Sequence, residues 1–294
     1  MNSLPVSGDE AYHLDEDIFR PLGQFVHREV EYDSGGFDIL RNMQREHFWY
    51  RGRHRFLLYA LSAELKRSQR NAAPLRAVDL GGGCGGWVRY LADRHPNAFA
   101  ELALADSALT ALQYARDVVP PSTPLYQCDL LRLGWNERWD VAFLLDVLEH
   151  IPDDAAALAS IRQSLTPGGL LFVTTPALRC FWTWNDDAAQ HQRRYNKADY
   201  RRLATQCGFE LLDSRYFMFF LSPMMMGVRW LARLRYGGRQ PTPDELKILV
   251  ERTHHIPARP LNAILSAVCA AETPLGHYLP FPWGTSILAI LRRS

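Results

Sequence analysis

Short apolar segments that end next to an aspartate alternate with segments of helical periodicity in the first half of the chain. The apolar segments are residues 75–80, 101–105, 124–127 and 139–145, and the last three lead to Asp106, Asp129 and Asp146. Strands that alternate with helices in this way predict a parallel, doubly wound sheet. Ligands of such sheets bind beyond the carboxyl ends of the strands. We therefore expect the three aspartates to lie on one rim of the sheet.

The rest of the chain extends this α/β pattern. Further strands are predicted at residues 170–174, 209–217 and 285–291, which gives a Rossmann-like, mostly parallel sheet of seven strands. Helices are predicted at residues 46–65, 87–94, 108–118, 153–165 and 197–207. Residues 1–45 are polar and show little periodicity. We therefore divide the chain into a leader with cap helices over 1–70 and a main α/β domain over 71–294, in which residues 222–283 form a helical insertion before the last strand.

A glycine cluster, DLGGGCGG, closes the first of these strands at Asp79–Gly86. Its glycines fit the dinucleotide fingerprint GxGxxG, with Asp106 about twenty residues further on. Asp79 argues against a pyrophosphate, because like charges about 4 Å apart repel by roughly 4 kcal/mol at an effective dielectric near 20. The ammonium and sulfonium groups of S-adenosylmethionine (SAM) would be attracted instead. Asp106 suits ribose hydroxyls and Asp129 an adenine amino group, although either could simply cap the helix that follows it.

Five segments in order carry a family resemblance: VDLGGGCGG, ALADSA, QCDL, DVAFLLDVLEHIPDD and LTPGGLLFVTTP. They resemble the motifs of class I SAM-dependent methyltransferases, especially the ubiquinone-biosynthesis-like branch and its polysaccharide- and lipid-associated relatives. The resemblance covers about residues 75–217. It implies a methyltransferase domain, SAM as cofactor and a small-molecule acceptor, apolar or lipid-linked acceptors included, whose reacting atom is oxygen, nitrogen or carbon.

The resemblance also implies the roles of individual residues. The cofactor-binding set is Asp79, Gly81, Gly83 and Gly85 at the methionine portion, Asp106 with Ser107 at the ribose, Asp129 and Leu130 at the adenine, and Asp146 near the transferring methyl. Cys84 departs slightly from the family pattern, at a position that is often Thr or Ser.

Candidate catalytic residues follow the fourth and fifth strands. His191 is the first candidate for a general base or acceptor contact, His150 the second and His47 the third, and each could instead be structural. Tyr195 is the candidate aromatic or hydroxyl partner of the acceptor. Arg53 or Arg55 could pair with the SAM carboxylate. The spacing of histidines and cysteines along the chain predicts no metal site.

Composition narrows the partners. The net charge of +1 and the lack of a long basic run argue against nucleic-acid binding. Five scattered cysteines without a CxxC pair, and an acidic N-terminus without an apolar core, predict a cytoplasmic protein with reduced thiols. The segment 222–283 could cap the acceptor pocket, complete the core or touch a membrane surface.

The function is thus predicted to be methyl transfer. The alternatives are a SAM-binding protein without transfer activity and, disfavoured by Asp79, an NAD-dependent oxidoreductase.

Overall fold

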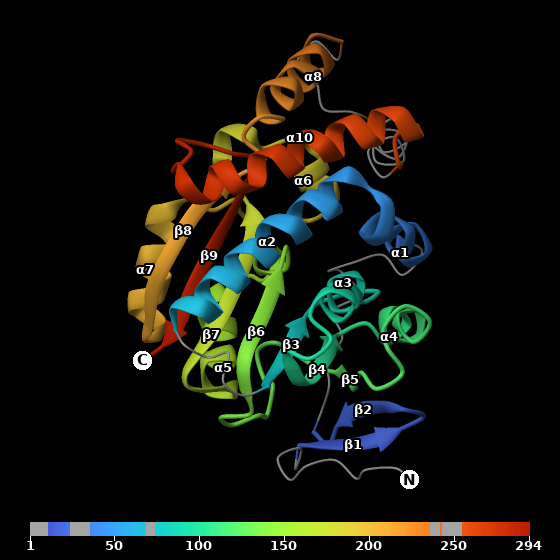
Figure 1. Cartoon of the computed structure of the whole chain (residues 1–294), viewed down its shortest axis with the longest axis vertical. Helices are drawn as coiled ribbons and strands as arrows, with labels where there is room; N and C mark the ends of the chain where they lie inside the picture. The colour runs from blue at the N-terminus through green and yellow to red at the C-terminus, as the bar shows by residue number, and fades with distance from the viewer. Residues whose placement is uncertain (1–10, 24–35, 69–73, 236–241, 243–254) are drawn as a thin grey trace.

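The computed structural model describes residues 11–23, 36–68, 74–235, 242 and 255–294 (Figure 1). The strands are β1 (Tyr12–Asp15), β2 (Ile18–Pro21), β3 (Leu75–Leu80), β4 (Phe99–Asp106), β5 (Leu125–Gln127), β6 (Trp139–Leu145), β7 (Leu165–Pro176), β8 (Phe209–Phe217) and β9 (Ser286–Arg293). The α-helices are α1 (Phe37–Glu46), α2 (Phe48–Arg67), α3 (Gly86–Arg94), α4 (Leu109–Ala115), α5 (Asp154–Ser164), α6 (Trp184–Ala188), α7 (Lys197–Cys207), α8 (Ser222–Arg235) and α10 (Arg259–Tyr278). Two short 3-10 helices are η3 (Leu148–His150) and η4 (Arg179–Phe181).

The described strands form one nine-stranded sheet in the order β1-β2-β5-β4-β3-β6-β7-β9-β8. The central strands β5, β4, β3, β6 and β7 are parallel, as predicted, and β9 runs antiparallel to both of its neighbours. The predicted number of seven strands is wrong. The two additional strands are an antiparallel hairpin, β1–β2, and β2 pairs in parallel with β5.

The hairpin comes from the segment that we read as a polar leader. Its two-residue turn, Glu16-Asp17, has positive φ at both positions, 45° and 67°. Such turns are usually signalled by Asn-Gly or Asp-Gly, and strands of four residues are too short for alternation to stand out. The sequence therefore carried no strong signal for it.

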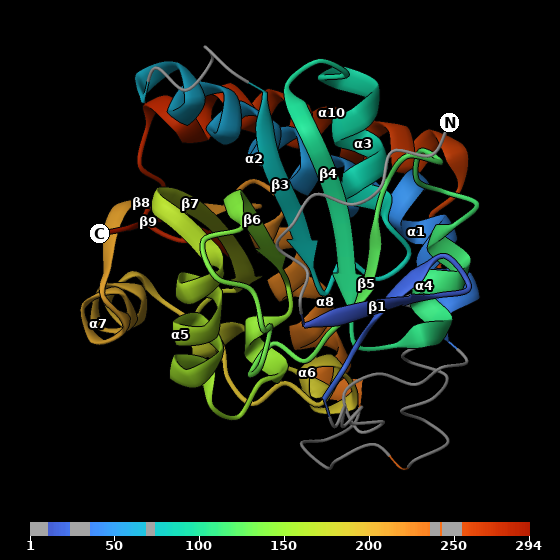
Figure 2. The same ribbon diagram turned by 90° about the horizontal axis from the view of Figure 1, so that it is seen from below.

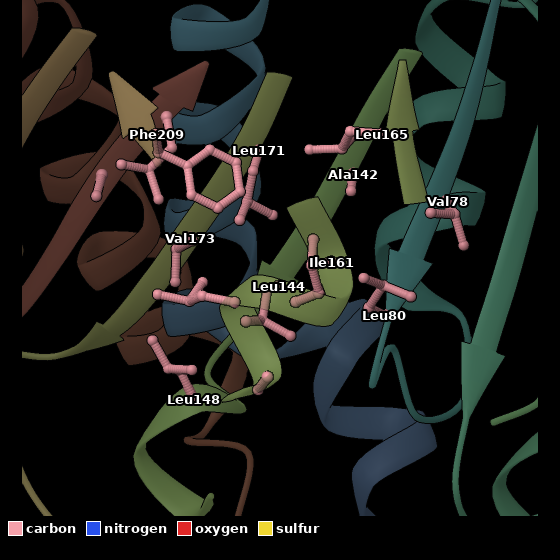
Figure 3. Packing of buried hydrophobic residues seen from close by; sticks show 14 of the residues in the cluster. Val78, Leu80, Ala142, Leu144, Leu148, Ile161, Leu165, Leu171, Val173 and Phe209 are labelled. Atoms are coloured by element: carbon pink, nitrogen blue, oxygen red, sulfur yellow. The ribbon is translucent and has the colours of Figure 1, made fainter. Parts of the chain in front are cut away.

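Both faces of the central sheet are buried. Successive side chains of a strand point to opposite sides, so each strand contributes to a core on both faces. Helices α2, α3 and α10 cover one face and α5 and α7 the other (Figure 2). The face toward α5 and α7 carries Val78, Leu80, Ala142, Leu144, Leu171 and Val173, which cluster with Leu148, Ile161, Leu165 and Phe209 (Figure 3). The opposite face carries Ala77, Val141, Phe143, Leu145, Leu170 and Phe172. Because helices cover both faces, the rim of the sheet is where a ligand can bind.

Two boundaries differ from the prediction. The predicted helix over residues 46–65 is α2, and a separate helix, α1, precedes it within the predicted leader. The Pro167-Gly168-Gly169 segment, read as the stop before a strand, lies inside β7, which begins directly after α5.

The predicted insertion contains α8 and α10, while residues 236–241 and 243–254 of it lie outside the described residues. Helix α10 is fastened to α2 by polar contacts: Asn262 accepts from the Phe48 N–H at 2.9 Å, and Arg55 donates to the Ser266 carbonyl at 2.9 Å. Helix α8 projects from the body at the end opposite the β1–β2 hairpin (Figure 1). Among the described residues, the helices include none with the length and apolar character needed to cross a membrane.

Candidate active site

A cavity of about 200 Å³ lies at the carboxyl ends of β3, β4 and β6, under α1 and α2. It is lined by Phe37, Leu40, Gln44, Trp49, Tyr50, Arg53, Asp79, Gly81, Gly82, Gly83, Trp87, Asp106, Ser107, Ala108, Cys128, Asp129, Leu130, Leu131, Leu145, Asp146, Val147, His150 and Ile151. The predicted convergence of Asp106, Asp129 and Asp146 on one rim is confirmed. Of the nine predicted cofactor-binding residues, only Gly85 does not line this cavity.

The glycine loop takes a conformation that other residues rarely adopt. Gly81 and Gly83 have φ of +70° and +59°, and a Cβ atom on Gly81 would lie 2.6 Å from a methyl group of Val147. Gly85, with φ of +79°, is the N-cap of α3, and its missing Cβ makes room for Val119. Glycine at position 85 is therefore explained by packing and backbone conformation.

Asp106 and Asp129 each organise the backbone beside them. The Asp106 carboxylate accepts from the N–H groups of Gly83 and Ala108, both at 2.9 Å, and so joins the glycine loop to the start of α4. Asp129 accepts from the Leu131 N–H at 2.9 Å, which closes a local turn. Both carboxylates therefore have a structural role at the rim of the sheet.

Asp79 lies under the glycine loop and is 1% exposed. Its Oδ1 atom has no hydrogen-bond partner among the described residues. Burial raises the pKa of the Asp79 carboxyl to about 7; Arg53 opposes this rise and Asp106 adds to it. A buried carboxyl with an unused oxygen in a cavity wall is prepared for a cationic partner.

Arg53 and Asp146 form an ion pair at the edge of the cavity. Asp146 follows β6 directly, has a φ of 58°, and also accepts from the Thr174 hydroxyl at 3.3 Å. The Arg53 guanidinium lies over the rings of Trp49 and Tyr50, 5.2 and 5.0 Å from their centroids. Arg55, the other predicted arginine, is directed to Ser266 instead.

Two of the three candidate histidines, His150 and His191, lie together, and only His150 lines the cavity. Their ring centroids are 4.7 Å apart with planes at 82°. Burial and the neighbouring His191 together lower the pKa of His150 to about 4, against the opposing effect of a hydrogen bond with the Ala189 backbone. The His191 ring is oriented by a hydrogen bond between its Nδ1 atom and a carboxylate oxygen of Asp186, 2.9 Å away.

Asp186 is hydrogen-bonded to both His191 and Arg194. Burial alone would raise the pKa of its carboxyl, but hydrogen bonds from His191 and Arg194 hold it well below its usual range. The Arg194 guanidinium donates to both carboxylate oxygens, at 2.7 and 3.0 Å. The position of His191 is thus fixed by a buried ion pair.

Two other candidates lie outside the cavity lining. Tyr195 is 1% exposed in the core, and its hydroxyl donates to Asp154 at 2.9 Å. His47 is the N-cap of α2 and accepts from the Trp49 N–H at 3.2 Å. Packing and helix capping account for both residues in this structure.

Several cavity residues were not singled out from the sequence. Gln44 on α1 donates to the Gly82 carbonyl at 3.2 Å and accepts from the Gly86 N–H at 3.1 Å, which clamps the glycine loop. Trp49 and Tyr50 come from α2. Their only sequence signal was the aromatic run HFWY at the start of the predicted helix.

Comparison with known proteins decides the family. A sequence model described as a methyltransferase domain matches residues 24–214, which is more than half of the chain. The chain belongs to the methyltransferase domain family. The resemblance of its motifs to class I SAM-dependent methyltransferases is thereby confirmed.

Curated relatives of this methyltransferase domain include two enzymes. Trans-aconitate 2-methyltransferase of Methylobacterium nodulans is 38% identical over 105 residues, 36% of this chain and 40% of that protein. Ubiquinone biosynthesis O-methyltransferase of Rhodopseudomonas palustris is 28% identical over 128 residues, 40% of this chain and 49% of that protein. The chain therefore spans about half the length, or less, of these relatives.

The fold has counterparts among solved structures. Phosphoethanolamine N-methyltransferase 2 of Haemonchus contortus, solved in complex with SAM, has a TM-score of 0.53 and 15% identity, over 94% of this chain and 61% of that one. This likeness supports the α/β methyltransferase fold.

Proposed function

We propose that the protein is an enzyme that transfers a methyl group from SAM to a small-molecule acceptor. The observation that carries the proposal is the buried Asp79 carboxyl group, which lines the glycine-walled cavity with one unpartnered oxygen. An anion there attracts the ammonium and sulfonium groups of SAM and repels a pyrophosphate. When bound, SAM supplies an electrophilic methyl group on its sulfonium.

The residues around the cavity fit this cofactor. Asp106 with Ser107 would hold the ribose, and Asp129 with Leu130 the adenine, because all four residues line the cavity and carboxylate oxygens accept hydroxyl and amino hydrogens. Arg53, whose guanidinium lies in the cavity wall, is the candidate for the SAM carboxylate.

We place the acceptor against Trp49, Tyr50 and His150, which all line the cavity. These aromatic rings suit an acceptor with an apolar or aromatic body. His150 is neutral near pH 7 because its pKa is about 4, so it can accept a hydrogen bond from the acceptor but is a weak base. We therefore assign most of the acceleration to positioning, with His150 as the contact and His191 as the residue that fixes it.

The segment 222–283 supports two roles for different parts. Leu265 and Cys269 of α10 are buried in the core beside α2, which supports core completion. Met224 and Met226 of α8 are 47% and 51% exposed, which supports a peripheral role as a cap edge or membrane-contact surface. We propose a leader with cap helices over 1–70 and a methyltransferase domain over 71–294, whose sheet the β1–β2 hairpin of the leader extends.

Binding and turnover test the proposal separately. Calorimetry should give micromolar SAM binding, roughly 8 kcal/mol, and no NADH binding. Incubation with SAM and a panel of phenolic, carboxylic and amine acceptors should produce S-adenosylhomocysteine only with a methylated product. Binding of NADH without SAM binding would overturn the cofactor assignment. SAM binding without turnover on any acceptor would support a binding protein instead of an enzyme.

A further inference from the structure

Three side chains with metal-ligating atoms meet at the wall of the cavity, which one of them, His150, lines. Glu149 and His150 belong to η3, and His191 lies in the loop between α6 and α7. Each offers one ligand atom, and these atoms all lie within 4.8 Å of one another. In a tetrahedral site with bonds of about 2.1 Å, the ligand atoms lie about 3.4 Å apart. Small side-chain rotations therefore suffice to bring the three atoms onto one ion.

Glu149 contributes a buried carboxyl group with a free oxygen. The residue is 1% exposed, and its Oε2 atom has no hydrogen-bond partner among the described residues. A buried polar atom without a partner is costly unless it serves a ligand. The Glu149 carbonyl accepts from the Gln192 N–H at 2.8 Å, so the loop that carries His191 is fastened to η3.

Both imidazoles are oriented in the way that metal-bound histidines are. In such sites one ring nitrogen binds the ion while the other is bonded to a carboxylate or a backbone carbonyl. Nδ1 of His191 is bonded to Asp186 at 2.9 Å, which leaves Nε2 for a ligand. The His150 ring is bonded to the Ala189 backbone, and its buried Nδ1 has no partner among the described residues.

We propose that Glu149, His150 and His191 bind one divalent transition-metal ion. Two imidazoles and one carboxylate favour ions such as Mn²⁺, Fe²⁺, Co²⁺ or Zn²⁺ over Mg²⁺ and Ca²⁺, which prefer oxygen ligands. Three protein ligands leave coordination positions open. His150 also lines the cavity, so an acceptor oxygen, such as a phenolate or a carboxylate, would bind the ion at an open position. With the ion bound, this contact replaces the hydrogen bond from the acceptor to His150. This use of the ion rests on the proposed function, whereas binding of the ion does not.

The spacing of ligands along the chain could not predict this set, because His150 and His191 are 41 positions apart. The fold brings them together because η3 follows β6 and the His191 loop follows β7, its neighbour in the sheet.

The test uses Co²⁺ alone as the probe, on chelator-treated full-length protein without SAM or acceptor. We expect one Co²⁺ per chain, with visible absorption bands that Zn²⁺ abolishes and excess Mg²⁺ does not. Glu149→Gln keeps the shape of the side chain and should weaken Co²⁺ binding at least about tenfold, as should His191→Ala, because even changes behind a metal ligand cost this much.

Two matched variants serve as controls. Glu272→Gln alters another buried glutamate, which accepts from the Phe220 N–H, and His13→Ala removes an exposed histidine. Both should bind Co²⁺ like the wild type. Melting curves and binding of S-adenosylhomocysteine report whether each variant is folded with an intact cavity.

The outcomes are distinct. Wild-type protein that binds no Co²⁺ overturns the proposal, and so does Co²⁺ binding that Glu149→Gln and His191→Ala leave unchanged. If the wild type binds Co²⁺ but no SAM, the proposed function is refuted by that result, and the metal site stands.

Discussion

Replacing Asp79 by asparagine should stabilise the ligand-free fold while destroying the cofactor site. The Asp79 carboxyl has a pKa of about 7 in the fold against an ordinary 3.8, chiefly because it is buried. The folded state therefore holds this proton more tightly than the unfolded chain does. The free energy of unfolding contributed by Asp79 must then fall as the pH rises from about 4 to about 7 and stay low above that, by up to about 4 kcal/mol.

Asp79→Asn removes the titration but keeps the shape of the side chain. At pH 8 we expect the free variant to be more stable than the wild type by about 1 to 4 kcal/mol, and at pH 4 nearly equal to it. SAM binding should respond in the opposite direction. Losing the anion that faces the ammonium and sulfonium should weaken it by about 2 to 5 kcal/mol.

Urea unfolding of both proteins at several pH values between 4 and 8 measures the stability difference, and calorimetry at pH 8 measures SAM affinity. Wild-type binding at pH 6.5 should also release a proton, visible as heat that depends on the buffer. A stability difference that is the same at pH 5 and pH 8 would refute the raised pKa. Unchanged SAM affinity in the variant would refute the role of Asp79.

Three further predictions concern the rest of the site. Asp106→Ala should weaken SAM binding by about 1 to 3 kcal/mol in calorimetry, because ribose hydroxyls and two loop amides lose their acceptor; an unchanged affinity would leave Asp106 as a helix cap alone. His191→Ala should lower turnover about a hundredfold while SAM affinity stays the same, and full activity on the true acceptor would make His191 purely structural. Replacing the half-exposed Met224 and Met226 by serine should leave the melting temperature nearly unchanged, whereas a large fall would place them in the core; co-sedimentation of the wild type with anionic liposomes tests the membrane-contact alternative.

The strands that the sequence predicted well are those with a clear apolar run or a clear start signal in the sequence. β6 and β8 begin and end where expected, because β6 is a continuous apolar run and β8 follows a helix that Gly208 terminates with a φ of +71°. The rim aspartates followed from strand direction alone. Family motifs then supplied the cofactor site.

What could not be predicted depends on which side chains the tertiary fold brings together. Arg53 and Arg55 are two positions apart on α2, so their side chains point in different directions. The neighbouring sequence does not indicate which of the two faces the cavity. Tyr195 was expected at the acceptor because it follows the fifth predicted strand, yet it pairs with Ala177, directly after β7, and its ring is buried. Burial of this kind is decided by contacts between distant segments.

The β1–β2 hairpin has a consequence for how the chain folds. Without it, the three-residue β5 would be the edge of the sheet, with unpaired backbone groups open to another chain. The hairpin is fixed by Tyr12, whose hydroxyl donates to the Leu133 carbonyl at 2.6 Å and whose ring packs on Tyr126 and Trp135. Its partners therefore leave the ribosome more than a hundred residues after it does. During synthesis the hairpin has no sheet to join, and aggregation through the β5 edge is prevented only once this long-range pairing has formed.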